Sequence, residues 1–196
     1  MKKGVVTLVV VAVVAIAVFM WIKGAYNGMV KADDGVQAAW SQVENVYQRR
    51  ADLIPNLVAT VKGYAAHESE TLESVVAARA KATQMTVDAE NLTPEALAKY
   101  QKAQGELGSA LGRLLMIQEN YPDLKANENF RDLQSQLEGT ENRITVERQK
   151  FNETARAYNT MIRQFPKNIF AGMFGFEKKP YFEADESAMT APKVEF

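Results

Sequence analysis

The side chains best suited to chemistry lie in the run His67-Glu68-Ser69-Glu70. This histidine is the only one in the sequence, and there is no cysteine. A zinc peptidase motif needs two histidines one helical turn apart with a glutamate between them, so one histidine cannot complete it. The lack of cysteine excludes disulfides and thiolate chemistry. We therefore expect His67 to be an ordinary polar residue at a helix junction.

Carboxylate pairs are the other candidates for chemistry. Asp33 and Asp34 could chelate a cation weakly, but adjacent acids on a glycine-containing segment are expected to face water. Glu68 and Glu73 share a helix face, which is typical of a solvated surface. Serine nucleophile elbows, phosphate-binding loops and dinucleotide-binding glycine patterns are absent from the sequence. The residues thus predict no enzyme, no cofactor, no metal and no small-molecule substrate.

The chain begins with an apolar run over residues 4–22, which has no charge and one hydroxyl group. As a helix it would be about 28 Å long, close to the hydrocarbon thickness of a bilayer. Ala15-Ile16-Ala17 has the form of a signal-peptide cleavage site, but the apolar run continues past it. We therefore expect a retained single-pass anchor after a short flank, residues 1–3. The positive-inside rule weakly favours a domain on the outer, periplasmic side of the inner membrane.

Composition bounds the class of partner. Lys and Arg number 23 and Asp and Glu 24, so the net charge is −1, and no block of like charge stands out. This argues against nucleic acid as a partner and leaves the lipid bilayer and other proteins. Ala, Gln, Glu, Leu and Arg are abundant beyond the apolar run, which is typical of helices.

Apolar residues recur at alternating steps of four and three after residue 30, as in amphipathic or coiled-coil helices. The expected helices cover about residues 30–66, 69–83, 94–121 and 123–165. Ser69 and Thr93 are expected N-caps, and Pro166 ends the last helix. Because the connections are short, the predicted class is all-α: an N-terminal transmembrane helix followed by an antiparallel four-helix bundle. The expected divisions are a juxtamembrane segment over 23–35, a bundle over 36–166, and a tail over 167–196 that is aromatic and then acidic.

Two positions bear on how straight the first helix is. Pro55 usually ends or bends a helix, but the apolar pattern keeps its register through it. We therefore expect one long helix with a bend at Pro55 rather than two helices and a turn. The glycine-containing segment 24–35 would either let anchor and bundle articulate or continue as helix at a cost of about 1 kcal/mol per glycine.

Arg50 and Glu147 stand at positions where the pattern calls for apolar groups. If the first and last helices are antiparallel with Val36 beside Phe165, Arg50 lies within reach of Glu147. The pattern predicts a buried ion pair between them, because an unpaired buried charge is very costly. Glu141 or Asp52 could compete for the guanidinium, and Arg50 could instead reach outward between helices.

Three glycines of the third helix, Gly105, Gly108 and Gly112, lie on one face beside its leucines. Each costs the helix about 0.8–1 kcal/mol against alanine, which suggests a use in close packing. The partner would be a neighbouring helix of the same bundle or a second copy of the chain.

The aromatic part of the tail does not continue the helical period. Its rings are expected near the lipid surface, against the base of the bundle, or on a neighbouring subunit. The residues concerned are Phe170, Phe174, Phe176, Tyr181 and Phe182.

Several segments together resemble LemA-family bacterial membrane proteins, over nearly the whole chain. They are Tyr26-Asn27, Ala39-Trp40-Ser41, Gln48–Val58 (QRRADLIPNLV), Thr60–Tyr64, Tyr121–Ala126 (YPDLKA), Leu133-Gln134, Thr140-Glu141, Tyr158-Asn159 and Phe165-Pro166. The resemblance implies a transmembrane helix followed by an antiparallel helical bundle, with no established reaction. It leaves the membrane orientation open, and it suggests TPM-domain membrane proteins as company.

These observations favour a non-catalytic scaffold or adaptor at the cell envelope that forms homo-oligomers or docks other membrane proteins. The first alternative is a sensor or regulatory subunit of an envelope stress or proteolysis system, bending at Pro55 or pivoting within residues 24–35. The second is a hydrolase whose site the sequence hides.

Overall fold

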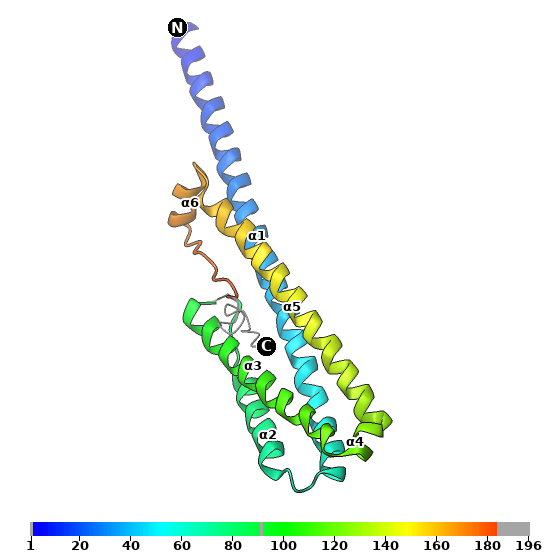
Figure 1. Cartoon of the computed structure of the whole chain (residues 1–196). Helices are drawn as coiled ribbons and strands as arrows, with labels where there is room; N and C mark the ends of the chain where they lie inside the picture. Colours follow the sequence, from blue (N-terminus) through cyan, green and yellow to red (C-terminus); the bar gives the residue numbers. More distant parts are fainter. Residues whose placement is uncertain (1, 91, 184–196) are drawn as a thin grey trace, which may run out of the picture.

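The computed structural model describes residues 2–90 and 92–183, and every regular element in these ranges is a helix (Figure 1). The predicted all-α class is confirmed. The acidic end of the predicted tail, residues 184–196, lies outside the described part of the chain.

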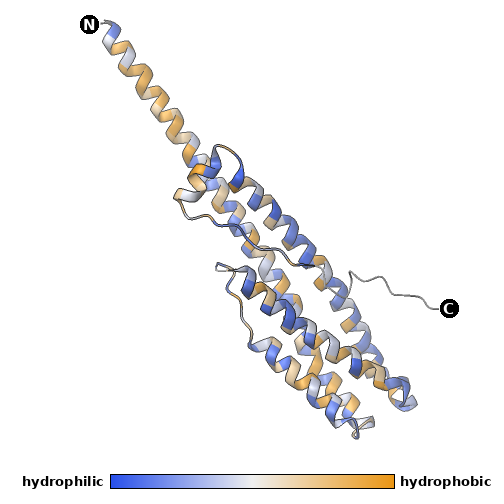
Figure 2. Cartoon of the chain, turned by 60° about the vertical axis from the view of Figure 1, so that its left-hand side comes forward, coloured by the Kyte–Doolittle hydropathy of each residue, from blue (hydrophilic) through white to orange (hydrophobic). Residues whose placement is uncertain are grey.

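The longest element is α1, one uninterrupted helix from Lys2 to Tyr64 that carries both the apolar run and the first helix of the bundle. An 18-residue window in its first part has a mean hydropathy of 3.0, and none of it is covered by the rest of the chain (Figure 2). The segment 24–35 is helical throughout, and Ala25 and Met29 within it are buried. The chain therefore continues as helix here and does not articulate.

Pro55 lies inside α1, as predicted. Proline has no backbone N–H, so the carbonyl of Ala51, four residues earlier, has no helical donor. The side chain of Arg79 replaces that donor, because its Nε donates to the Ala51 carbonyl at 2.8 Å. Arg79 belongs to α2, which spans Ser69–Gln84. The long helix thus passes through a proline because a neighbouring helix satisfies the exposed carbonyl.

Four long helical segments form the bundle: the part of α1 beyond the apolar run, α2, α3 (Pro94–Met116) and α5 (Glu128–Arg163). The connection between α3 and α5 contains a 3-10 turn, Ile117–Glu119, and the short helix α4, Pro122–Ala126. α1 packs along α5, α2 packs along α3, and α2 also packs on α1. Among the described helices, the backbones of α3 and α5 lie farther apart than those of α1 and α5, and we call this side of the bundle the open edge. At one end of it, the Glu183 carbonyl accepts from Gln101 of α3 and Arg148 of α5 at 2.9 Å each.

Local capping explains where the helices begin. The side chain of Thr93 accepts from the Ala96 N–H at 3.1 Å ahead of Pro94, which confirms the predicted cap. Asn127 caps α5 in the same way by accepting from the Phe130 N–H at 2.9 Å. Ser69 is instead the first residue of α2 and makes no cap.

The buried residues fall into two cores along the bundle. The membrane-proximal core is rich in aromatic rings and lies mainly between α1 and α5. The distal core is mainly aliphatic and is enclosed by α1, α2, α3, α4 and α5. The buried polar residues Arg50, Gln104 and Thr140 lie between the two sets.

The register of α1 against α5 differs from the predicted one. Level pairs such as Trp40 with Phe151 and Arg50 with Glu141 have residue numbers that sum to 191. The predicted pairing of Val36 with Phe165 would require a sum of 201.

A further helix that the sequence analysis did not predict, α6 (Lys167–Met173), follows α5 and packs on both α5 and α1.

Candidate functional site

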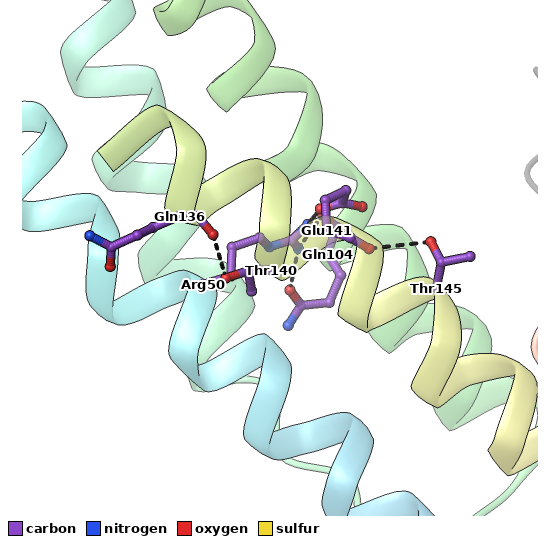
Figure 3. Close-up of polar contacts among 6 residues, drawn as sticks. All are labelled: Arg50, Gln104, Gln136, Thr140, Glu141 and Thr145. Atoms are coloured by element: carbon purple, nitrogen blue, oxygen red, sulfur yellow. Dashed lines mark hydrogen bonds and ion pairs between the residues drawn. The ribbon is translucent and has the colours of Figure 1, made fainter. Parts of the chain in front are cut away.

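A polar layer centred on Arg50 separates the two cores (Figure 3). The guanidinium of Arg50, whose side chain is 4% exposed, donates from Nη1 to Glu141 at 2.9 Å. Its Nη2 donates to Gln104 twice, to the side-chain Oε1 at 2.7 Å and to the backbone carbonyl at 3.0 Å. The ring of Tyr47 lies 5.1 Å from the guanidinium carbon. Arg50 therefore ties α1 to both α3 and α5.

The predicted partner of Arg50 is wrong. Glu147 forms an ion pair with Lys150 at 2.8 Å, whereas Glu141, the named competitor, takes the guanidinium. The cause is the register: at a sum of 191, Glu141 is level with Arg50 and Glu147 lies almost two helical turns away. The Glu141 side chain is 59% exposed, so the pair runs from the interior to the surface.

A groove of about 310 Å³ opens between α3 and α5 at the level of this layer. Its lining combines polar side chains with the small residues of α3: Tyr47, Arg50, Gln101, Gln104, Gly105, Gly108, Ser109, Glu141 and Arg148. The groove marks the open edge of the bundle.

The three predicted glycines behave differently from one another. A Cβ at Gly108 would lie 3.8 Å from Nη1 of Arg50, so this glycine faces the polar layer. A Cβ at Gly105 or Gly112 would meet no described atom within 4 Å. Of the two predicted partners for this face, a helix of the same bundle thus meets Gly108 alone, and at Gly105 and Gly112 the described residues leave the face uncovered.

Beyond α6, residues 177–183 run back along the bundle as an extended segment, which we call the strap (Figure 1). Gly175, with a φ of 76°, turns the chain from α6 into the strap. Two asparagines of α5 hold its backbone. Asn159 donates to the Lys179 carbonyl at 2.8 Å and accepts from the Lys179 N–H at 2.9 Å. Asn152 does the same with Phe182, at 2.9 and 2.8 Å.

The spacing of these contacts is matched. Seven residues of helix and three residues of extended chain both cover about 10 Å, so each asparagine meets a backbone unit of the strap. Each asparagine thus donates to and accepts from one main-chain unit of the strap, and Asn159 also donates to the Tyr181 hydroxyl.

Phe182 anchors the end of the strap inside the membrane-proximal core. Its ring stacks on Trp40 at 5.9 Å and meets Phe151 edge-on at 5.5 Å, while the Arg148 guanidinium lies over it at 4.8 Å. The expectation of a lipid-facing Phe182 is therefore wrong. Tyr181 accepts a hydrogen bond from Asn159 at 2.8 Å and so also belongs to the bundle.

The other predicted tail rings pack on the first helix at the base of the bundle. Phe170 meets Trp21 at 5.7 Å, and Tyr26 meets Phe174 at 5.0 Å and Phe176 at 5.7 Å. The base of the bundle was one of the predicted locations for these three rings.

Charged groups reinforce the strap. Lys179 forms an ion pair with Asp33 at 3.1 Å, and its side chain is 10% exposed. Asp33 also accepts from Gln37 at 3.0 Å. Burial raises the pKa of the nearby Tyr158 hydroxyl to about 12, and the charge of Asp33 adds to the shift. Asp33 thus fixes the strap, which corrects the expectation that it faces water.

His67 is not among the residues that line the groove between α3 and α5. His67 is exposed in the turn between α1 and α2, as predicted for a junction residue. No group of three histidine, cysteine or carboxylate side chains that could hold a metal occurs within residues 2–90 and 92–183. The groove presents a guanidinium, an amide and a partly exposed carboxylate.

The chain is similar to known proteins over most of its length. The LemA family model matches residues 39–196. Magnetosome protein MamQ 2 of Paramagnetospirillum magneticum is 28% identical over 95% of this chain and 76% of that protein. Magnetosome protein MamQ of Magnetospirillum gryphiswaldense is 28% identical over 86% of this chain and 70% of that protein. Protein LemA of Metamycoplasma hominis is 25% identical over 89% of this chain and 76% of that protein.

Proposed function

The chain belongs to the LemA family, and from that premise we propose that it is a non-catalytic scaffold, anchored in the membrane by α1, that self-associates along the open edge between α3 and α5. The observation that carries this proposal is the uncovered face of Gly105, Ser109 and Gly112 beside the 310 Å³ groove. Glycines inside a helix cost stability, and on this face no described helix makes use of the close approach that they permit.

The continuity of α1 supports the choice of a scaffold over a pivoting sensor. A sensor that articulates within residues 24–35 would need a flexible joint, but this segment is one helix with Ala25 and Met29 buried. A bundle held by a continuous helix keeps its open edge in a fixed position relative to the anchor. Such an arrangement suits the assembly of several copies side by side.

The proposed setting is the inner membrane of a bacterial cell, crossed once, with the bundle on the outer, periplasmic side. The uncovered apolar segment supports the span, and the unbroken run from that segment into the bundle supports its retention. TPM-domain membrane proteins remain candidate partners by family resemblance alone.

Crosslinking in membranes tests the self-association. Because the chain has no cysteine, a single Ser109→Cys substitution places one thiol on the exposed face of α3. In vesicles containing the full-length protein, this variant is expected to form disulfide-linked dimers. Adding Gly112→Leu should abolish most of the dimer while the melting temperature stays the same or rises, because a Cβ there meets no described atom and leucine favours helix.

Gly139→Leu is the matched control. Gly139 is an exposed glycine in the middle of α5 whose Cβ would also meet no described atom within 4 Å. This substitution should leave the Ser109→Cys dimer intact. If no dimer forms, or if Gly112→Leu and Gly139→Leu have equal effects on it, the open edge is not the self-association surface.

A further inference from the structure

The short helix α6 and the residue before it present an apolar edge to the outside of the molecule. Phe165 is 82% exposed, Ile169 is 51% exposed and Met173 is 72% exposed. Their spacing of four residues places Ile169 and Met173 on one side of α6. The other side packs on the protein, because Ala171 is buried and Phe170 meets Trp21. This edge, Phe165, Ile169 and Met173, is the α6 edge.

The height of α6 is fixed by its contacts with α1. Trp21 lies at the end of the apolar run and meets Phe170 at 5.7 Å, and Tyr26 meets Phe174 at 5.0 Å. Trp21 and Tyr26 are about 8 Å apart along a helix. The α6 edge therefore lies at the level where α1 leaves the hydrocarbon layer.

We propose that the α6 edge is a second membrane contact, in which these three side chains enter the lipid surface of the leaflet from which α1 emerges. The proposal rests on α1 spanning the membrane. The binding partner of the α6 edge is lipid, because a surface that is level with the end of a transmembrane helix faces headgroups and the upper acyl chains. Large apolar side chains that are exposed in water gain free energy when that boundary takes them in.

Neighbouring residues suit the same location. Trp21 and Tyr26 are both partly exposed at this level, and aromatic rings of this kind favour the interface. Lys23, two residues after Trp21 in α1, and Lys178, in the strap after α6, are both exposed and can meet lipid phosphates. With α1 and the α6 edge both held, the bundle cannot rotate freely about the α1 axis.

Spin labels on single cysteines test the contact in the full-length protein, because the chain has no native cysteine. The variants are Met173→Cys on the α6 edge, Val11→Cys in the apolar run, and Val76→Cys, 52% exposed on α2. Each is placed in vesicles of phosphatidylcholine and phosphatidylglycerol. The measurement is accessibility to oxygen, which concentrates in lipid, and to a water-soluble nickel chelate.

The label at Met173→Cys is expected to be severalfold less accessible to nickel than the label at Val76→Cys and more accessible to oxygen. Equal nickel accessibility at the two sites would overturn the proposal. Protection from both reagents at Met173→Cys would mean that protein, such as a second copy, covers the edge, which also overturns it. A water-exposed label at Val11→Cys would mean that α1 does not span, so failure of the anchor is distinguished from failure of the contact.

A second substitution checks that the apolar edge causes the effect. Ile169→Asp in the Met173→Cys background should raise nickel accessibility severalfold by withdrawing the edge from lipid. Val76→Asp in the same background should leave it unchanged. If Ile169→Asp does not change the nickel accessibility, the label is near the membrane but the edge is not inserted, and the proposal is overturned.

Discussion

The two ends of the bundle solve the same packing problem with different side chains. The proximal core is built on Trp40, whose ring meets Tyr100, Phe151 and Phe182 at 5.3–5.9 Å. The distal core is filled mainly by leucine, isoleucine, valine and alanine from helices packed at regular spacing. Aliphatic side chains at helical period can be enclosed by helices alone. The aromatic core instead needs the connection between α2 and α3 and the strap, neither of which is helical.

Removing the ring at the centre of the aromatic core should have the largest effect. Trp40→Ala is expected to lower the free energy of unfolding by about 3–5 kcal/mol, because it leaves a cavity. It should also release the strap, since Phe182 stacks on that ring. Unfolding is measured with urea in detergent micelles by circular dichroism, and release by tryptic cleavage after Lys178.

Leu114→Ala is the matched substitution in the distal core, where Leu114 is fully buried. It should also destabilise, by about 2–5 kcal/mol, but leave the strap protected from trypsin. If both variants expose Lys178 equally, the two cores act as one unit and the contrast between them fails.

The polar layer between the cores should have the next largest effect. Arg50→Met is expected to cost about 2–3 kcal/mol, because Gln104 loses a charged donor and stays buried. Glu141→Gln should cost only about 0.5–1 kcal/mol, since that carboxylate is largely exposed. The two effects should be non-additive in a double-mutant cycle measured by urea denaturation.

The same cycle with Glu147→Gln provides the control. Glu147 pairs with Lys150 on the surface of α5, so its effect and that of Arg50→Met should add within about 0.5 kcal/mol. Strong coupling of Arg50 to Glu147 would restore the pairing that the sequence predicted and refute the observed register.

An effect smaller than that of Arg50→Met is expected beside Pro55 in the distal half. Arg79→Met should cost about 1–2 kcal/mol, because the Ala51 carbonyl loses its donor. Pro55→Ala returns a backbone N–H to that carbonyl, so in its background Arg79→Met should cost much less. Urea denaturation of the four proteins measures the difference. An unchanged cost would mean that Arg79 acts through packing alone.

Features that repeat along the chain were predictable from the sequence. The period of apolar residues predicted the four long helical segments, the uninterrupted passage through Pro55 and the burial of Arg50, and Thr93-Pro94 predicted the start of α3. It was wrong where the third predicted helix ran to residue 121, because α3 ends at Met116, and where one helix was expected over 123–165, because Asn127 separates α4 from α5. The register was not predictable in this way, because a repeating pattern looks similar after a slide along the helix. The observed register holds to the distal end, where Asn127 donates to the Tyr64 hydroxyl at 2.9 Å.

The tail was only partly predictable for a related reason. The strap has no helical period, and Asn152 and Asn159 bind its backbone, so a period of apolar residues cannot predict where it lies. The α6 edge left a signal that sequence analysis missed, the four-residue spacing of Phe165, Ile169 and Met173. The number of aromatic rings in the tail drew attention to Phe182 instead, which packs inward.

The unbroken α1 also sets a distance. Between Ile22 and Tyr64 it rises by about 63 Å at 1.5 Å per residue. Held along the membrane normal, it places the turn that contains His67 about 60 Å above the hydrocarbon layer. A binding partner that meets this turn must therefore reside in a layer at that height, or extend down to it.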